Sequence, residues 1–373
     1  MLPEPNYPAR PEQFLGRREQ IEAFEEALRY GAVTRRMASF AVLGDWGIGK
    51  SSLLLKFASI LARSEQKILP VSLSVGTDFG DYRNLAESLL DRLAKTLTTS
   101  ESIVDRIRAE AKKWKLKRVN VGGLTLDRQT PRFLSSGSVL LRDALDDAWK
   151  CLLKPAHLDG AMFFLDDLHN LPSAAQAALA IRDQFQSFGV EGLNYSVCFS
   201  ARADYFSGIR SFAEPAVRFY NKVYLAAFTF EETSGYVQAV FGTKPDDARP
   251  LADWLFDKTL GHPFFLAFIS RQLLFHTRGS VAASPARHWP DIFEKLEKDK
   301  FSSDLGQVSD REKELLRAIG KSPDEEFAPG QFVTQPEYVY LRRLTEKGLV
   351  VRTGRGRYKL YHPLFREFLR QKE

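Results

Sequence analysis

The chain has 373 residues, of which 44% are hydrophobic and 27% charged, an ordinary balance for a globular protein of two or three domains. Its two cysteines do not make a disulfide framework, and its six histidines lack the spacing of metal ligands. No apolar run approaches the ~18 to 20 residues of a membrane helix, and the first residues lack the apolar stretch of a signal peptide. We therefore expect a soluble cytoplasmic protein, whose net charge of +6 permits an acidic partner without requiring one.

Short apolar runs rich in Val, Leu and Phe alternate with longer stretches that have helical spacing. The runs that indicate buried strands are residues 38–44, 68–75, 161–167, 195–202 and 222–228. Helical spacing lies between them, as in residues 50–64 and 139–154. Strands that are apolar on both faces and alternate with helices predict an α/β fold, with a parallel sheet covered on both sides.

Residues 44–52, GDWGIGKSS, follow the first apolar strand and open a helix. Gly44, Gly49, Lys50 and Ser51 fit the pattern G-x-x-x-x-G-K-[ST] of a phosphate-binding loop. Glycines let successive N–H groups point at phosphate oxygens, and the helix N-terminus adds positive charge. Lys50 would reach the β- and γ-phosphates of a nucleotide, and the Ser51 hydroxyl would bind Mg²⁺. The nucleotide-binding residues predicted from this loop are Gly44, Asp45, Trp46, Gly47, Ile48, Gly49, Lys50, Ser51 and Ser52.

Residues 112–128, KKWKLKRVNVGGLTLDR, interrupt the alternation of strands and helices. Their pattern around Gly122 and Gly123 predicts a β-hairpin in which several lysines lie close together. Both a solvated insertion and a contact for an acidic partner are compatible with this composition.

The apolar run AMFFLDD ends on two carboxylates, Asp166 and Asp167. A P-loop protein needs an acidic element of this kind to position the metal and the attacking water. We expect Asp166 to hold Mg²⁺ through water, and Asp167 to be the catalytic base or the carboxylate that orients water. The alternative is that both carboxylates cap the next helix.

From about residue 231 the strand patterns stop and helical patterns follow. A charged stretch near 294–311 indicates a connector between this helical part and the end of the chain. The expected domains are a P-loop core of residues 1–230, a helical lid of residues 231–305 and a winged-helix domain of residues 306–373.

The pattern of the last domain predicts two helices, a small β-hairpin and a final helix. The first helix, residues 309–320, has Ser309 as a plausible cap with Glu312 three residues on. The second lies within residues 336–350, where Gly348 can end it. Helices followed by a two-stranded wing make a winged helix.

Residues 331–372 hold ten Lys or Arg and three Glu, a net charge of +7. In a winged helix that binds DNA, the recognition helix enters the major groove and wing arginines hold phosphates or the minor groove. The candidate DNA-binding residues on the recognition helix and the wing are Arg342, Arg343, Arg352, Arg355, Arg357 and Lys359. The alternative is a winged helix that contacts protein or holds the P-loop core in an autoinhibited form.

These motifs, taken in order, resemble the P-loop ATPases of the AAA+/STAND group, and within it the archaeal-type ATPases related to origin-recognition initiators. GDWGIGKSS is similar to their Walker A loop and FFLDD to their Walker B strand. FLGRREQIEAFEEAL, residues 14–28, resembles the motif that packs near the adenine, which places Phe14, Gly16 and Arg17 at the base or ribose. By the same resemblance Arg202 in VCFSAR is the sensor of the γ-phosphate, and Pro263 in GHP opens the lid helix.

Two departures from the group affect the expected activity. The Walker B pair is Asp-Asp where Asp-Glu is commoner in AAA+ enzymes, and the lid motif lacks the arginine of the AAA+ initiators. Both departures favour the STAND side of the group, with slow hydrolysis. The resemblance further implies that Arg218 is an arginine finger for a neighbouring subunit in a homo-oligomer. A surface arginine paired with a carboxylate is the alternative for Arg218.

Two functions are consistent with these patterns. The first is a slowly hydrolysing, Mg²⁺-dependent ATPase that acts as a nucleotide-controlled switch and associates with duplex DNA through its winged helix. The second is a STAND-type signalling ATPase, in which the winged helix contacts a protein partner or autoinhibits the core. DNA binding that depends on salt and on ATP would distinguish the two.

Overall fold

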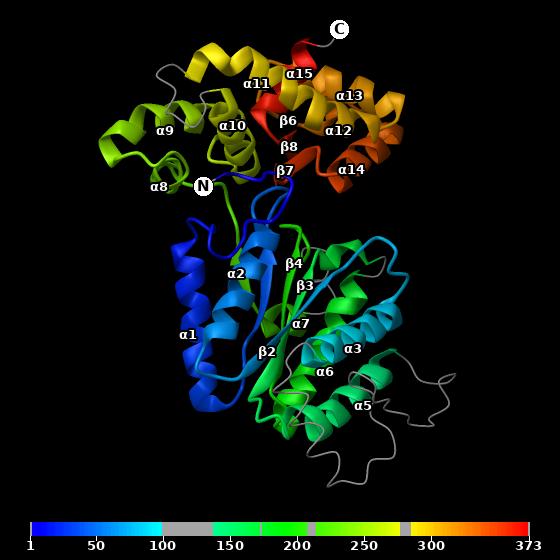
Figure 1. Cartoon of the computed structure of the whole chain (residues 1–373). Coiled ribbons are helices and arrows are strands. Elements are labelled where there is room, and N and C mark those ends of the chain that lie inside the picture. Colours follow the sequence, from blue (N-terminus) through cyan, green and yellow to red (C-terminus); the bar gives the residue numbers. More distant parts are fainter. Residues whose placement is uncertain (1, 99–136, 172–173, 207–213, 277–284, 372–373) are drawn as a thin grey trace. The chain divides into compact units, whose positions relative to one another are not determined.

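The computed structural model describes residues 2–98, 137–171, 174–206, 214–276 and 285–371 (Figure 1). The chain forms two compact units. The first, here called the P-loop unit, is Pro8–Ala226, and the second, the C-terminal unit, is Ala227–Glu373 with Met1–Tyr7. The hairpin expected at 112–128 lies outside the described residues. Within those residues, no helix has both the length and the apolar character needed to cross a membrane.

The P-loop unit is built on a parallel sheet with the strand order β2-β3-β4-β1-β5. The strands are β1 (Ser39–Leu43), β2 (Ile68–Ser74), β3 (Gly160–Asp166), β4 (Tyr195–Ala201) and β5 (Tyr220–Tyr224). The described helices are α1 (Arg18–Thr34), α2 (Lys50–Arg63), α3 (Tyr82–Thr98), α5 (Gly137–Ala148), α6 (Ala174–Glu191) and α7 (Glu214–Phe219). The predicted α/β class with a parallel sheet is therefore confirmed. The strand expected at 222–228 is β5, which begins and ends earlier in the chain.

Both faces of the sheet are buried, which explains why its strands are continuous apolar runs. On β1, Ala41 and Leu43 belong to a hydrophobic cluster with residues of α3, α5 and α6. Phe40 and Val42 alternate with them and belong to a second cluster with residues of α1 and α2. Figure 1 shows α1 and α2 on one side of the sheet, and α3 and α5 on the other. The loops at the carboxyl ends of the strands are therefore held on a rigid base.

The C-terminal unit begins with helices and ends with a small antiparallel sheet of order β6-β8-β7. The helices are α8 (Phe230–Phe241), α9 (Pro245–Thr259), α10 (Pro263–His276), α11 (Trp289–Leu296), α12 (Ser302–Gly306), α13 (Asp310–Lys321), α14 (Tyr338–Glu346) and α15 (Pro363–Gln371). The strands are β6 (Glu326–Phe327), β7 (Val350–Gly354) and β8 (Arg357–Leu360). From α13 to α15 the order of helices and wing is that of the predicted winged helix, with the short strand β6 as an addition.

The connector predicted at 294–311 is wrong in its structure, because most of this segment is helical. α11 continues through a π-helical turn at Glu297–Phe301 into α12, and α13 starts at Asp310. Phe301 is fully buried, and its ring lies 5.5 Å from that of Phe365 and 5.3 Å from that of Phe368, both on α15. Most charged residues of the segment are exposed, although Asp304 is buried and pairs with Lys300, so a count of charges concealed a helix with a buried face.

The start of α13 is held by the capping box that the sequence predicts. The Ser309 hydroxyl accepts from the Glu312 amide at 3.4 Å, and the Glu312 carboxylate accepts from the Ser309 amide at 2.8 Å. Lys347, just after α14, donates to the same carboxylate at 2.8 Å. Glu312 is almost fully buried, so this ion pair joins α13 to the end of α14 inside the winged helix.

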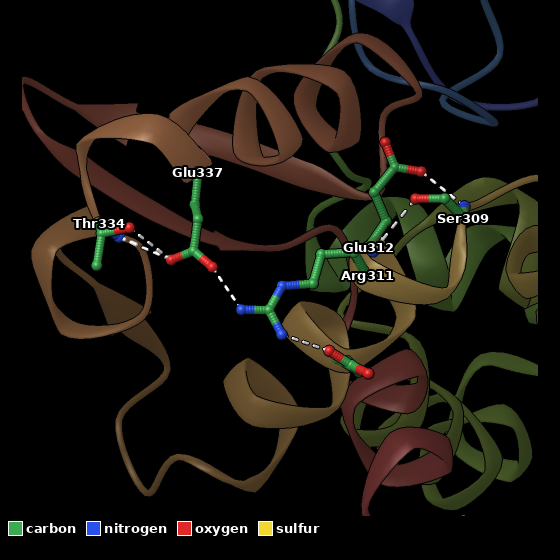
Figure 2. Close-up of polar contacts among 6 residues, drawn as sticks. Ser309, Arg311, Glu312, Thr334 and Glu337 are labelled. Carbon is green, nitrogen blue, oxygen red and sulfur yellow. Dashed lines mark hydrogen bonds and ion pairs between the residues drawn. The ribbon is translucent and has the colours of Figure 1, made fainter.

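A second ionic contact fixes the turn before α14, as Figure 2 shows. Arg311 donates to Glu314 on its own helix at 2.6 Å and to Glu337 at 2.5 Å. Glu337 also accepts from the amide of Thr334 at 3.0 Å. The bond from this amide and the contact with Arg311 lower the pKa of Glu337 to about 2. α14 is therefore tied to α13 at both of its ends.

Candidate nucleotide site

The predicted phosphate-binding loop runs from the end of β1 to the start of α2. Gly47 and Gly49 have φ values of 69° and 97°, which only glycine adopts without strain. Gly49 is the N-cap of α2 and has no side chain, so it offers no side-chain acceptor to the first N–H groups of the helix. At Gly44 a Cβ atom would lie 2.7 Å from Ile48 Cγ2 and 3.1 Å from the carbonyl oxygen of Leu225. The loop geometry thus requires glycine at each of these three positions.

Lys50, the first residue of α2, points back into the loop. Its Nζ donates to the backbone carbonyl of Asp45 at 2.8 Å, and the side chain is buried. Burial lowers the pKa of the Lys50 ammonium, and Arg202 acts in the same direction, whereas Asp167, Asp166 and Asp45 raise it. The lysine and both predicted acidic residues are therefore electrostatic neighbours, although they come from distant parts of the sequence.

Asp166 is the last residue of β3, and its carboxylate is held by a residue that the sequence analysis did not identify. Ser200, near the end of β4, donates to Asp166 Oδ1 at 2.5 Å and accepts from the amide of Asp167 at 2.8 Å. Ser200 stands two residues before Arg202 in the same predicted motif, and this proximity was the only signal for it in the sequence.

Asp167 lies in the turn after β3 with a left-handed backbone, φ 57°. Burial raises the pKa of its carboxyl group, and the neighbouring Asp166 raises it further, while Lys50 lowers it. His169 lies beside it, with Nδ1 3.9 Å from Asp167 Oδ1. Burial lowers the pKa of His169 to about 4, and the positive charges of Lys50 and Arg202 act in the same direction. The ring is therefore neutral at neutral pH. His169 was not among the predicted site residues.

Arg202 follows β4, and its Nε lies 3.4 Å from Asp204 Oδ1. It acts electrostatically on Lys50 and His169, which places it in the same group of charges. Arg218, the predicted finger, is an exposed residue of α7. Its role therefore stays a prediction.

The predicted base or ribose residues precede α1. Arg17 is buried in a left-handed backbone conformation, with φ 61°, and its guanidinium donates to the carbonyl of Ile48 at 3.3 Å and of Ala226 at 2.5 Å. Phe14 packs against the hydrophobic cluster on the α1 side of the sheet, and Gly16 has φ 71°. Arg17 thus connects the segment before α1 to the phosphate-binding loop and to the chain after β5.

Ser52, also predicted to bind nucleotide, has a partner within the protein. Its hydroxyl accepts from the amide of Ala9 at 3.0 Å, and one turn later Lys56 donates to the carbonyl of Pro11 at 3.1 Å. The segment before Phe14 is therefore fastened along α2. Trp46, in the same loop, is 47% exposed.

The predicted lid motif, residues 261–263, belongs to the C-terminal unit. Gly261 has φ 72°, and a Cβ atom there would lie 2.0 Å from the carbonyl oxygen of Phe228. The amide of Phe228 donates to the Gly261 carbonyl at 2.8 Å. Pro263 is the first residue of α10, as the motif predicts for the opening of a helix.

His362, just before α15, lies against the same turn. Its Nδ1 accepts from the amide of Leu364 at 3.1 Å, so its Nε2 carries the proton and donates to the carbonyl of Thr259 at 2.9 Å. Its ring centroid lies 3.9 Å from that of Phe265 on α10. The helical part and the winged helix are thus packed together within the C-terminal unit.

The basic residues of the winged helix are of two kinds. Arg366 and Arg370 on α15 donate to backbone carbonyls between Gly320 and Glu325, which gives them a structural role. The predicted DNA-binding residues lie on α14 and the wing, where Arg342, Arg343, Arg352, Arg355 and Arg357 are exposed and Lys359 is partly buried. Within this second set, Arg342 Nε lies 3.4 Å from Glu346 Oε1, and Arg357 Nη1 lies 3.5 Å from Glu326 Oε2.

Comparisons with known proteins agree with this geometry. Residues 13–181 match the family described as the AAA ATPase domain. No curated protein matches the sequence. Among solved structures, the Walker-type ATPase PABY2304 of Pyrococcus abyssi is similar, with a TM-score of 0.60, 17% identity and coverage of 97% of both chains. The ORC2 protein of Aeropyrum pernix in its ADPNP-ADP complexes has a TM-score of 0.60 and 14% identity, over 99% of this chain and 96% of that one.

The match covers the phosphate-binding loop and both acidic residues, and the structural likeness extends over almost the whole chain. Residues 13–181 therefore form an AAA ATPase domain of the P-loop AAA+ group, in a chain that has the fold of these archaeal Walker-type and ORC2 proteins.

Proposed function

We propose that the chain binds ATP with Mg²⁺ at Gly44–Ser52 and hydrolyses it slowly. In this proposal the bound nucleotide controls whether the winged helix of the chain associates with duplex DNA. The observation that carries the ATP site is the meeting of Lys50, Asp166 and Asp167 at the carboxyl edge of one parallel sheet. Ligands of open α/β sheets bind at this edge, outside the ends of the strands.

The groups around the loop suit a magnesium nucleotide. The N–H groups at the start of α2 and the Lys50 ammonium favour phosphate. Ser51 and Asp166 supply the oxygen ligands that Mg²⁺ prefers, and a bound Mg²⁺ would neutralise charge on the phosphates. The ADPNP-ADP complexes of the ORC2 protein, which shares the fold, support the choice of an adenine nucleotide.

Asp167 is the proposed base. Burial and Asp166 raise its pKa, and a base with a raised pKa is better matched to proton transfer near neutral pH. Its side chain is one methylene shorter than the glutamate commoner at this place, which supports slow hydrolysis. Arg202, close to Lys50 and His169, is the proposed sensor of the γ-phosphate.

The DNA proposal is supported by the arrangement of basic side chains on the winged helix. Arg342 and Arg343 are exposed on α14, the helix that would enter the major groove. Arg355 and Arg357 flank Gly356 at the exposed tip of the wing. Long cationic side chains on a hairpin tip can reach backbone phosphates, which supply most of the affinity for DNA.

A salt titration of duplex binding tests this proposal. Arg355→Glu with Arg357→Glu should reduce the slope of log affinity against log salt by about 2, roughly 0.9 for each lost phosphate contact. The matched control is Lys295→Glu with Lys298→Glu, which makes the same charge change on α11 and the turn after it in the same unit. An unchanged slope in the folded wing variant would refute DNA contact by the wing.

The alternative is a signalling ATPase whose winged helix acts on protein. His362, just before α15 of the winged helix, contacts Thr259 beside the turn that opens α10. This contact favours the alternative, because α15 can then respond directly to a movement of the lid helices. Under this alternative the wing variant would retain wild-type DNA behaviour, and removal of residues 306–373 would raise ATP turnover.

Arg218 remains the proposed arginine finger of a homo-oligomer. An Arg218→Ala variant keeps Lys50, and a Lys50→Ala variant keeps the finger. Mixing the two inactive proteins should restore part of the activity, because a mixed interface contains one complete site. Fingers contribute ~10³-fold or more to turnover, so the restored activity would be readily measured. A mixture that stays inactive would assign Arg218 to the protein surface.

A further inference from the structure

Ser200 makes a pair of contacts that no other described serine makes with the acidic residues of the site. It is fully buried on β4, one position beyond the pairing of Phe199 with Leu165 on β3. Its hydroxyl donates to Asp166 Oδ1 at 2.5 Å and accepts from the amide of Asp167 at 2.8 Å. A hydroxyl has one proton to give, and here that proton is committed to the carboxylate.

The first contact orients a charged group. A hydrogen bond from a hydroxyl to an ionised carboxylate is shorter and stronger than one between neutral groups. The distance of 2.5 Å falls in the range of such bonds. Because this bond engages Oδ1, it fixes the plane of the Asp166 carboxylate and leaves Oδ2 as the oxygen that would serve a metal or the water that the metal holds.

The second contact fixes the turn that carries the proposed base. Asp167 has φ 57° and ψ 46°, a left-handed conformation that few residues other than glycine adopt. Ser200 holds its amide, and the amide of Asn170 holds its carbonyl at 2.9 Å. Asn170 in turn donates from its side chain to the carbonyl of Val75, just after β2, at 2.9 Å. The turn is therefore fastened from the strands on both sides of β3.

We propose that Ser200 is a positioning residue that sets the orientation of both acidic groups, Asp166 through its carboxylate and Asp167 through its backbone. In this proposal it acts through these two residues. This inference rests on the proposed ATPase function and adds a determinant of metal use to it. Its role is separate from that of Arg202, two residues later, which is the proposed sensor of phosphate.

The strand itself supplies a matched control. Ser196 lies on β4 four residues before Ser200 and is also fully buried. Its hydroxyl faces the sulfur of Met37 at 3.8 Å instead of a carboxylate. Ser196→Ala therefore removes a buried hydroxyl from the same strand, at its other end, and leaves the acidic pair intact.

The experiment uses the full chain as wild type, Ser200→Ala, Ser200→Thr and Ser196→Ala, each checked by thermal unfolding. ATP turnover is measured over a range of Mg²⁺ concentrations, and ATP affinity is measured in Mg²⁺ and in EDTA. Ser200→Ala should lower kcat at least about tenfold, the lower end for loss of a hydrogen bond to a charged group. It should also raise the Mg²⁺ concentration at half-maximal turnover, while affinity in EDTA stays within about twofold of wild type.

Ser200→Thr keeps the hydroxyl and should recover most of both values, and Ser196→Ala should match wild type. Equal losses of affinity in Mg²⁺ and in EDTA would mean that Ser200 only supports the fold, and unchanged kinetics in Ser200→Ala would overturn the inference directly. If Ser200→Thr does not fold, the ATP affinities of Ser200→Ala in Mg²⁺ and in EDTA still distinguish a positioning role from a role in folding. A wild-type chain that neither binds nor hydrolyses ATP would instead overturn the proposed function.

Discussion

The turn at Gly261 offers a sharp test of how the C-terminal unit is held together. Replacing Gly261 by alanine adds one methyl group in a backbone with φ 72°, where the new Cβ would lie 2.0 Å from the Phe228 carbonyl oxygen. Gly242, in the same unit, has φ 67° and no atom within 4 Å of the same methyl position. The two substitutions therefore share the backbone strain and differ in the steric contact.

The expected cost follows from these two geometries. A left-handed alanine costs roughly 1–2 kcal/mol, which is the whole expected effect of Gly242→Ala. Gly261→Ala adds overpacking of about 1–3 kcal/mol. It also breaks the bond from the Phe228 amide to the Gly261 carbonyl, worth about 1 kcal/mol. We expect a total of about 3–6 kcal/mol, a large part of the stability of one domain.

Urea unfolding of both variants and the wild type, monitored by far-UV circular dichroism, measures the difference. The transition of the C-terminal unit should shift to a lower urea concentration in Gly261→Ala, well beyond its position in Gly242→Ala. If the two variants unfold at the same urea concentration, the close approach of Gly261 to Phe228 does not constrain the turn, and the reasoning fails.

The other predictions concern two residues of the nucleotide site and one buried histidine of the C-terminal unit. Lys50→Ala should weaken ATP binding by about 10- to 100-fold, the range for a lost hydrogen bond to a charged group; an unchanged affinity by calorimetry would contradict the site. Asp167→Asn should lower turnover by about 10²–10⁴-fold with affinity nearly unchanged, and single-turnover assays would show otherwise if another residue were the base. Burial lowers the pKa of His362 to about 4 in the folded chain. As pH falls, this histidine is therefore protonated in the unfolded chain before it is protonated in the folded one. The stability from neutral His362 is complete above about pH 6.5 and is lost as pH falls through about 4. His362→Gln should flatten this loss in unfolding free energies measured from pH 7 to 4.

The local parts of this protein were predictable from its sequence. The continuous apolar runs predicted the parallel strands, because each buried strand must be apolar on both faces. The spacing of Gly44, Gly49 and Lys50 predicted the loop between β1 and α2, because its glycines serve a backbone geometry set within a few residues. Ser309 and Glu312 predicted the start of α13 for the same reason, since a capping box joins residues three apart.

Contacts between distant segments depended on the tertiary structure. Ser200 meets Asp166 across 34 positions of the chain, and Arg17 meets Ala226 across 209. The first pair is decided by which strands are neighbours and in what register, and the second joins the start of α1 to the chain after β5. No local sequence pattern encodes either contact. The order β2-β3-β4-β1-β5 places β4 beside β3 and so brings Ser200 to the acidic pair.

Charge was the property for which the sequence alone misled most. The net charge of the last residues includes Arg366 and Arg370, whose guanidinium groups are taken up by backbone carbonyls within the fold. The charges near 294–311 suggested a connector, although Phe301 in the same stretch anchors a buried helical face. Composition determines how many charges a segment has, whereas packing decides which of them face water, because one helix presents some side chains to the core and others to solvent.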